Sequence, residues 1–562
     1  MTASLSRLPR WLQPAAWAPF VPKLVTVFQE GYTAERLKAD FSAGLTVAIV
    51  AMPLSMALAI ASGVGPERGL FTAIVAGFFI SALGGTRHQI GGPTGAFVVV
   101  VFGVVARYGY DGLVVATLMA GLMLMAAGWI RLGAFIKYIP YPVVTGFTTG
   151  IALIIFSSQV GDLLGLRLVH PPADVLERWQ AYAAAIGTFH WQALFVAVLA
   201  ILLIVGFQLR WPRLPAFLIA IAAVTTFCFA LHVPVETIAS RFGAIPRLLP
   251  PPHLPALGFA QIRALFPAAL TIAVLGGIES LLSAVVADGM TGRRHRSNCE
   301  LVAQGFANIA SAMMGGIPAT GAIARTATNI RAGARTPVSG MIHAAGVLVM
   351  MLILAPLVAY VPLAALAAVL VIVCWNMAEF AACRAILRGP GGDAALLVVT
   401  FLLTVFIDLS VAIGVGVVLS ALIFMHRMSE TVALETGTKL LDADAREGLP
   451  DAATRVERRA LPRGVEVFRL NGPFFFGAAA KFEETLFRIG SRPRAIIVVM
   501  EDVPLIDASG AIILKKFLKA AAARHARVVL VGVQSGPHDV LDAMRVDVRE
   551  AATLEAALAQ LA

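Results

Sequence analysis

Charge is scarce in this chain: only 14% of its 562 residues are charged, whereas 59% are hydrophobic. Soluble globular domains carry about 25% charged residues, so the composition argues against a soluble enzyme and indicates a protein that crosses a membrane several times. The net charge of +11 does not call for a nucleic-acid partner. The basic residues lie between apolar stretches, as expected for the cytoplasmic loops of a membrane protein.

Cysteine is also rare, with four residues and no CxxC pair, so we expect free thiols and no metal site. The chain has no GxSxG, GxxxxGK[ST] or HExxH motif. These absences argue against a serine hydrolase, an ATP-driven pump and a zinc protease, and we expect neither a cofactor nor enzymatic activity. The first forty residues lack the apolar core that a cleavable signal needs, and 1–40 is interpreted as a cytoplasmic segment.

Fourteen apolar stretches are long enough to cross or half-cross a bilayer. The first seven cover residues 43–62, 70–83, 94–107, 112–130, 142–158, 191–207 and 215–231. The second seven cover 267–287, 299–314, 319–330, 338–357, 363–376, 393–408 and 410–426. We therefore predict a polytopic α-helical membrane protein with a transport domain over 41–430. The distribution of basic loops places both termini in the cytoplasm and Arg107, Arg178 and Arg263 on the external side.

The two sets of seven are related in sequence. LTVAIV at 45–50 matches LTIAVL at 270–275, and TGAF at 94–97 matches TGAI at 320–323, with offsets of 225 and 226. An odd number of crossings makes the second copy enter the membrane from the opposite side, which predicts inverted repeats at about 41–231 and 266–426. Inverted repeats with short, interrupted helices are typical of secondary transporters, whose substrate binds near the bilayer midplane.

Two glycine-rich stretches are the best candidates for the substrate site. GGPTGAFVVV at 91–100 and GGIPATGAIARTATNIR at 315–331 each place glycines and a proline before a short helix. A helix N-terminus offers unpaired N–H groups and the positive end of a dipole, so two facing half-helices form an anion site. Candidates for the helix start, for capping or donor hydroxyls, and for close approach to the backbone are Gly92, Pro93, Thr94, Gly95, Thr320 and Gly321.

Two charges fall near the middle of predicted spans, where a charge is costly and therefore a candidate functional group. Arg325 is interpreted as positive potential for an anion; the alternative is a structural arginine paired with Glu279. Glu279 is interpreted as a protonatable group that couples proton and substrate; the alternative is a structural carboxylate. Ser280 is a candidate for a weaker ligand contact. Four further polar residues are interpreted as loop groups that orient helices: Asp288, Asn298, Glu300 and Asn308.

The composition changes to that of a soluble domain near residue 436. Strand-like stretches at 465–470, 495–500 and 527–533 alternate with helix-like stretches at 479–489 and 509–524. This alternation predicts a small α/β domain, so that 436–562 forms a linker and a soluble domain. The charged run at 442–459 is interpreted as a solvated linker or first helix.

The stretch GLTVAIVAMPLSMALAIASGVGPERGLFTAIVAG at 44–77 closely resembles the signature region of the SulP, or solute carrier 26, anion transporters. The likeness continues through GGIESLLSAVVADGMTG and PATGAIARTATNIRAGA, and FRLNGPFFFG and LIDASG resemble a STAS domain. The resemblance implies a core domain with the two half-helices, a gate domain, elevator-like movement, and a homodimer with cytoplasmic STAS domains. It also implies a bacterial inner-membrane location.

By the same resemblance, the anion site lies between the half-helices, at Gly92, Pro93, Thr94, Gly95, Ala96 and Phe97 and at Thr320, Gly321, Ala322, Ala324 and Arg325. Many animal members have Ser-Arg where this chain has Ala324-Arg325, so one hydroxyl is missing. Glu279 matches a carboxylate that the family associates with proton coupling, and sodium is the alternative coupling ion. The motifs IESLL, DGMTG and RAGA are most similar to those of the bacterial C4-dicarboxylic acid transporters of the family.

The similarity of these three motifs favours proton-coupled uptake of succinate, fumarate or aspartate. Sulfate or bicarbonate transport, or anion exchange, are the alternatives. A hypothesis of another class is a membrane-tethered signalling protein in which the STAS domain is the working part. The STAS loop reads Asp507-Ala508-Ser509-Gly510, where stand-alone STAS regulators have Asp-Ser-Ser-Gly with a phosphorylated serine. We therefore expect dimerisation and regulation through this domain, with Ser509 as a helix N-cap.

Overall fold

The computed structural model describes residues 18–134, 140–168, 172, 174–211, 214–255, 258–407, 409–431, 433–436, 462, 464–475 and 493–561. The chain divides into two compact units, Met1–Val417 and Val418–Ala562. The charged run at 442–459 and the helix predicted at 479–489 lie outside the described residues.

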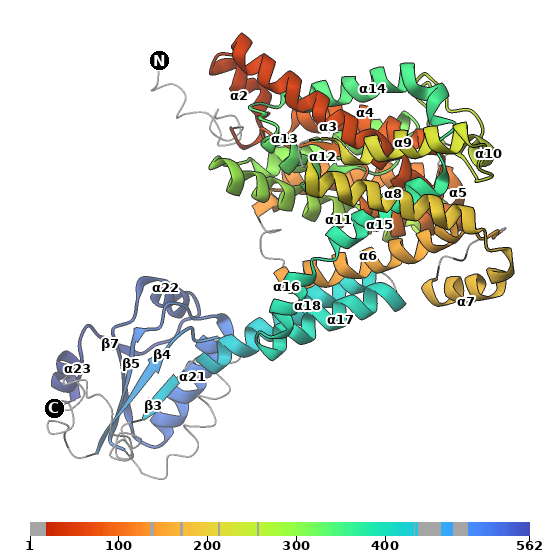
Figure 1. Cartoon of the computed structure of the whole chain (residues 1–562). Helices are drawn as coiled ribbons and strands as arrows, with labels where there is room; N and C mark the ends of the chain where they lie inside the picture. Colours follow the sequence, from red (N-terminus) through yellow and green to blue (C-terminus); the bar gives the residue numbers. More distant parts are fainter. Residues whose placement is uncertain are drawn as a thin grey trace. The chain divides into compact units, whose positions relative to one another are not determined.

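Helices follow the first seven apolar stretches (Figure 1). They are α3 (Ala34–Ala61), α4 (Pro66–Leu83), α5 (Gly95–Trp129), α6 (Tyr141–Leu164), α8 (Trp191–Arg210) and α9 (Ala216–Ala230). The third and fourth predicted spans are joined in α5, but its backbone breaks at Gly109, where φ is 70°. Glycine takes this left-handed conformation at little cost, so α5 consists of two spans that meet at the break.

The second seven stretches are helical as well. They form α11 (Phe259–Thr291), α12 (Ser297–Met313), α13 (Ile323–Arg331), α14 (Val338–Val358), α15 (Leu363–Met377), α17 (Gly391–Phe406) and α18 (Leu409–Thr431). Within the described residues of the first unit, four short helices were not predicted, because they are too short or too polar to give an apolar span: α2 (Lys23–Gln29), α7 (Val175–Ala185), α10 (Ile238–Phe242) and α16 (Phe380–Leu387). All fourteen predicted spans therefore coincide with helical backbone.

The first span begins earlier than its apolar stretch. Thr33 caps α3 by accepting a hydrogen bond from the backbone N–H of Arg36 at 3.4 Å, and Glu35 lies in the positive first turn. The helix therefore starts at Ala34, before the predicted residue 43, because capping and charge favour a polar first turn that hydropathy does not detect.

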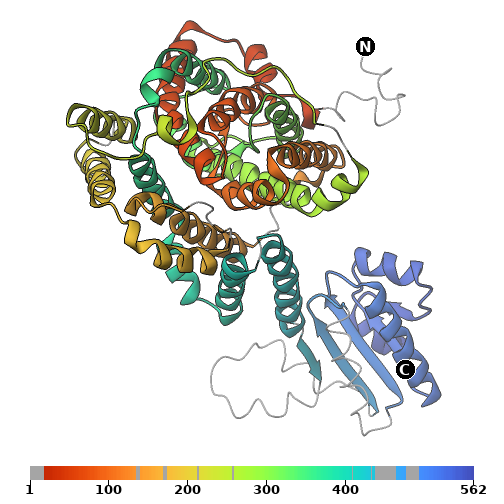
Figure 2. The ribbon, with the colours of Figure 1, turned by 90° about the vertical axis from the view of Figure 1, so that its right-hand side faces the viewer.

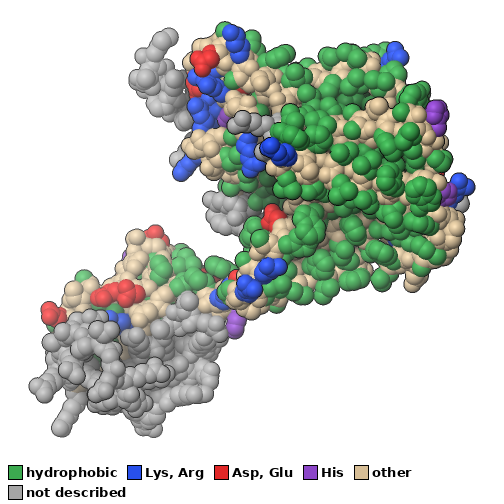
Figure 3. Space-filling view, viewed as in Figure 1, with side chains coloured by type: hydrophobic (Ala, Val, Ile, Leu, Met, Phe, Trp, Pro, Cys, Tyr) green, Lys and Arg blue, Asp and Glu red, His purple; other side chains and the backbone are tan. Residues whose placement is uncertain are grey.

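The surface of the helical unit suits a bilayer. In the described part of the chain, nine helices are long and apolar enough to cross a membrane. Figure 3 shows hydrophobic side chains covering most of the visible face of this unit. Leu209 and Phe259, for example, are 82% and 84% exposed. Apolar surface of this extent is costly in water and stable against lipid, so the protein is a multi-pass membrane protein.

The helices of the first unit pack in two groups, which lie side by side in Figure 2. The core group contains α3, α4, α5, α11, α12, α13 and α14. The gate group contains α6, α8, α9, α15 and α17. Contacts of α3 and α5 with α6, and of α3 with α15, join the two groups. Each group combines helices from both repeats.

The second unit is an α/β domain. Its sheet has the order β3-β4-β5-β6-β7, from Ala433–Thr436, Val465–Asn471, Ala495–Asp502, Arg527–Val531 and Arg549–Ala551. β3 is antiparallel to β4, and the other pairs are parallel. Alternate residues of β5 enter two hydrophobic cores, with Val498 on one face and Ile497 on the other.

Helices of this unit complete the two cores. They are α21 (Ala508–Ala523), α22 (Ser535–Ala543) and α23 (Leu554–Leu561). Residues of α21 and α22 belong to the core that contains Val498, and residues of α23 belong to the other. The prediction that Ser509 caps the helix after β5 is wrong. Asp507 is the cap and accepts from the Gly510 N–H at 2.7 Å, because the helix already begins at Ala508.

Candidate functional site

The two glycine-rich stretches meet inside the core group. β1 (Gly91–Gly92) pairs antiparallel with β2 (Thr320–Gly321). The Ala322 N–H donates to the Ile90 carbonyl at 2.8 Å, next to this pair. Backbone hydrogen bonds therefore hold together the two segments that lead into α5 and α13.

Both half-helices begin directly after this pair. α5 starts at Gly95 and α13 at Ile323, and neither N-cap, Thr94 or Ala322, makes a side-chain capping hydrogen bond. The first N–H groups of a helix have no partner within the helix, so these two starts offer donors and the positive ends of two dipoles. The expectation that Pro93 begins the first half-helix is off by two residues.

Arg325 lies in the first turn of α13 and is only 4% exposed. Its Nη2 donates to the Pro93 carbonyl at 2.8 Å, while Nε and Nη1 have no hydrogen-bond partner in the described part of the chain. A Cβ added at Gly92 would lie 2.5 Å from Nη1, so a side chain there would displace the guanidinium from its present position. The second half-helix thus places a buried cation against the residues that precede the first.

Glu279 lies in α11 and faces the first half-helix. The Thr94 hydroxyl donates to its Oε2 at 2.9 Å. No hydrogen bond or ion pair joins Glu279 to Arg325 in the described part of the chain. Arg325 and Glu279 therefore do not form the structural pair that was the alternative interpretation. The two charged groups instead contact neighbouring residues of the same segment, Pro93 and Thr94.

Ser280 is hydrogen-bonded on the other side of α11. Its hydroxyl accepts from the Gln89 side-chain amide at 2.7 Å and donates to Glu300 Oε1 at 3.2 Å. Gln89 in turn lies directly over Gly321, where any side chain would collide with its amide. Ser280 thus supports the segment before β1, and its predicted contact with substrate remains a prediction.

The interpretation of Glu300 and Asn308 as loop residues is wrong, since both are buried within α12. Glu300 Oε2 accepts from the Gly85 N–H at 2.9 Å and from the Thr86 hydroxyl at 3.2 Å. Asn308 accepts from the Ala319 N–H and donates to the Ala319 carbonyl. These side chains fix the segments before β1 and β2. Their position inside the apolar stretch 299–314 was the signal that they are buried.

The remaining predicted residues shape the site. The Thr320 hydroxyl donates to the Gly276 carbonyl at 2.9 Å, so it neither caps α13 nor points freely at a ligand. Phe97 is 1% exposed and packs near Gly276, and Ala96 is fully buried. Ala322 is buried, whereas Ala324 is exposed in the first turn of α13. Hydropathy alone could not predict which of these residues are buried and which are exposed.

Two residues that the sequence did not single out adjoin the site. Met377, at the end of α15, lies so close to Gly95 that an added Cβ would be 2.7 Å from its sulfur. The gate group therefore touches the start of the first half-helix. His343 in α14 is fully buried, and neither ring nitrogen has a partner in the described part of the chain. A histidine within an apolar span is a weak signal, because most such residues are structural.

Two adjoining half-helix starts, a buried arginine and a carboxylate within a bundle of apolar helices are typical of a class of protein, the secondary membrane transporters with interrupted helices. The chain matches the sulfate permease family over residues 37–400 and the STAS domain over residues 460–557.

Curated relatives agree with this class. The chain is 40% identical to the putative sulfate transporter YvdB of Bacillus subtilis, over 91% of this chain and 94% of that protein. It is 31% identical to the bicarbonate transporter BicA of Picosynechococcus, over 88% of each chain.

Solved structures show the same fold. Murine solute carrier 26 family member A9, in the inward-facing state, matches with a TM-score of 0.85 at 17% identity, over 99% of this chain and 96% of that chain. The transmembrane domain of a cyanobacterial BicA matches with a TM-score of 0.61 at 30% identity, over 69% of this chain and 98% of that chain. The protein belongs to the sulfate permease (SulP, solute carrier 26) family of anion transporters and carries a C-terminal STAS domain.

Proposed function

We propose that this protein carries small inorganic oxoanions, of the sulfate or bicarbonate kind, across the membrane by secondary transport. The observation that carries the proposal is the junction of α5 and α13, where two helix starts without a side-chain cap meet beside the buried Arg325 guanidinium. Backbone donors and a desolvated cation favour a compact anion over a neutral solute.

We base the choice of anion on the substrates for which the relatives are named, rather than on single short motifs. IESLL, DGMTG and RAGA favour C4-dicarboxylates, but the two relatives described above, each matched over about nine-tenths of this chain, are named for sulfate and bicarbonate. Overall similarity over about nine-tenths of the chain outweighs three short matches. Succinate-like substrates therefore become the second candidate.

Glu279 is the group that we assign to coupling. It is a carboxylate inside a span, and its Oε2 accepts a hydrogen bond from Thr94, the residue that precedes the first half-helix. Protonation would change the charge beside the bound anion, which links proton and anion binding. Sodium is the alternative coupling ion.

We further propose that the core group moves against the gate group as an elevator, and that the protein is a homodimer through its STAS domains. A bacterial inner-membrane location with cytoplasmic termini completes the proposal. The assignment of 41–430 to transport and 436–562 to the linker and STAS domain also belongs to it.

Uptake into proteoliposomes tests the substrate. Radiolabelled sulfate, bicarbonate and succinate are offered with imposed proton or sodium gradients, and each unlabelled anion is used as a competitor. We expect sulfate or bicarbonate uptake that succinate does not inhibit. Uptake of succinate alone would instead support the hypothesis of C4-dicarboxylate transport. Absence of uptake of every anion would favour the signalling hypothesis.

A further inference from the structure

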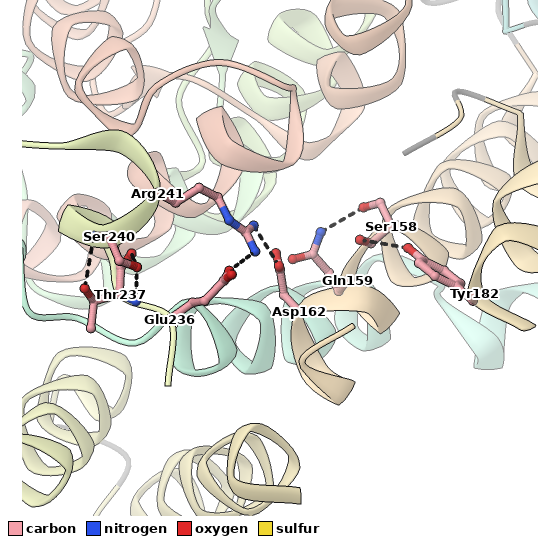
Figure 4. A network of polar contacts seen from close by, with 8 residues as sticks. All are labelled: Ser158, Gln159, Asp162, Tyr182, Glu236, Thr237, Ser240 and Arg241. Atoms are coloured by element: carbon pink, nitrogen blue, oxygen red, sulfur yellow. Dashed lines mark hydrogen bonds and ion pairs between the residues drawn. The ribbon is translucent and has the colours of Figure 1, made fainter. Parts of the chain in front are cut away.

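The unpredicted helix α7 is fixed on the gate group, beside the end of α6. The Tyr182 hydroxyl donates to the Ser157 carbonyl at 2.9 Å, and the Trp179 indole N–H donates to the Ser157 hydroxyl at 3.2 Å. Figure 4 shows Tyr182 directed at the α6 segment that contains Ser158. α7 is thus anchored to α6 by hydrogen bonds, and the side chains on its inner face have defined positions.

The end of α6 is braced independently of α7. Arg241 of α10 forms ion pairs with Asp162, at 2.8 Å, and with Glu236 (Figure 4). A capping box between Thr237 and Ser240 stabilises the start of α10. The single guanidinium of Arg241 is engaged by two carboxylates, so this network offers no free cation to an anionic ligand.

A cavity of about 170 Å³ lies between α5, α6, α7 and α17. Its polar and ring lining includes Phe102 and Arg107 of α5, Ser158 of α6, Asp174 and Arg178 of the α7 region, and Thr404 of α17. A water molecule occupies about 30 Å³ of liquid, so the cavity has room for several waters or for a small hydrated ion.

Arg178 supplies the buried charge of this cavity and is 3% exposed. Its Nε donates to the Pro172 carbonyl at 2.8 Å, and its guanidinium carbon lies 5.1 Å from the centroid of the Phe102 ring. No carboxylate forms an ion pair with Arg178 in the described part of the chain. The two contacts hold the guanidinium in place without pairing it directly with a carboxylate.

The lining as a whole carries more positive than negative charge. Arg107 and Arg178 oppose a single carboxylate, Asp174. That carboxylate is already engaged, because its Oδ1 accepts from the backbone N–H groups of Leu176 and Glu177 as the cap of α7. The potential inside the cavity therefore favours an anion.

The cavity adjoins the half-helix junction. Ile155 lines the cavity, and its Cδ1 would lie 3.4 Å from a Cβ added at Gly95, the first residue of α5. Val98, in the first turn of α5, also lines the cavity. The cavity and the helix start thus share apolar neighbours from the gate group and the core group, Ile155 and Val98.

We propose that this cavity is a second anion site, in which Arg178 and Arg107 hold a small oxoanion before it reaches the half-helix starts from the face that is predicted to be external. The inference rests on the proposed function, since the ligand is the transported anion. The site gives α7 a role: it places a buried cation on the path to the half-helix junction.

Thiol labelling tests the site without relying on transport. The full chain with Cys383→Ser carries Ser158→Cys or, in a second variant, Val99→Cys, and is treated with anionic and cationic methanethiosulfonates of similar size. We expect Arg178→Gln to lower the ratio of anionic to cationic labelling rates about tenfold, and sulfate to protect both positions in the Arg178 background. Arg263→Gln, an exposed arginine on the same predicted face, should leave the ratio unchanged.

An unchanged labelling ratio in Arg178→Gln, absence of sulfate protection, or absence of labelling at both positions would overturn the proposal. Transport gives a second readout: Arg178→Gln should raise the external KM for the anion three- to tenfold with nearly unchanged maximal rate, and leave the KM at the opposite face unchanged. An equal rise on both faces would assign Arg178 to structure instead. Failure of sulfate and bicarbonate transport with positive labelling would reject the proposed substrate, and not the site.

Discussion

The segment before α5 and the segment before α13 have matching backbones and different side chains. Gly91 and Gly92 pair with Gly321 and Thr320, and each segment leads into a helix whose cap uses no side chain. The charged groups at this junction come from one side only. Arg325 and Glu279 both belong to the second repeat, and they contact Pro93 and Thr94 of the first.

The repeat offsets show how one-sided this arrangement is. With offsets of 226 and 225, Arg325 corresponds to Val99 and Glu279 to Leu54. The duplicated fold supplies two helix starts at equivalent positions. Charge placed on one copy then distinguishes the two starts, so substitutions at equivalent positions should have unequal effects.

The largest effect should come from Arg325→Ala. Removal of the buried guanidinium takes away the cation beside the first half-helix and leaves the Pro93 carbonyl unpaired. A hydrogen bond to a charged group contributes about 1.5–3 kcal/mol, so we expect anion affinity to fall roughly 10- to 150-fold. Equilibrium binding in detergent and uptake KM measure this loss. Arg331→Ala, an exposed arginine on the same helix, is the control. Wild-type affinity in Arg325→Ala would remove the basis for an asymmetric site.

Glu279→Gln should abolish proton-driven accumulation and retain anion exchange. The amide still accepts from Thr94 but cannot bind or release a proton in the physiological range. With one coupled proton, a gradient of one pH unit supports about tenfold accumulation, which we expect to vanish. Proteoliposome uptake with and without a pH gradient measures it. The matched control is Glu300→Gln, which removes the other buried carboxylate nearby. Loss of proton drive in Glu300→Gln alone would move the coupling role to α12.

Thr94→Val and Thr320→Val compare equivalent positions directly. The Thr94 hydroxyl reaches Glu279, whereas the Thr320 hydroxyl reaches the Gly276 carbonyl. One hydrogen bond is worth about 0.5–1.5 kcal/mol, so Thr94→Val should change the pH dependence of uptake and shift KM roughly two- to tenfold. Thr320→Val should lower thermal stability without changing the pH profile. Identical pH profiles in the two variants would show that Glu279 does not act through Thr94.

The smallest effect should come from Ala324→Ser. Ala324 is exposed in the first turn of α13, so an added hydroxyl faces free space and can donate to an oxoanion. We expect sulfate affinity to rise less than about tenfold, the value of one neutral hydrogen bond. Ala327→Ser, one turn further along, is the control. A loss of affinity in Ala324→Ser alone would indicate that the anion lies nearer the first half-helix.

The sequence predicted much of the fold because membrane spans are local features. Twenty apolar residues identify a helix without knowledge of its neighbours, and the match of TGAF to TGAI identified the two stretches that pair as β1 and β2. α7 was missed because Val175–Ala185 is amphipathic and short, so that its burial depends on α6. Glu300 was misplaced because two of its hydrogen-bond donors, Gly85 and Thr86, lie more than 200 residues away in the sequence.

By itself, the sequence determined the membrane class, the repeat, the soluble domain and the two residues, Arg325 and Glu279, whose charges are unusual in apolar spans. Those properties depend on composition and spacing along the chain. The tertiary structure decided what each charge touches: Arg325 reaches Pro93, Glu279 reaches Thr94, and the two do not pair. Hydrogen-bond partners separated by more than 180 residues are brought together by the packing of the two repeats, and no local pattern encodes that choice.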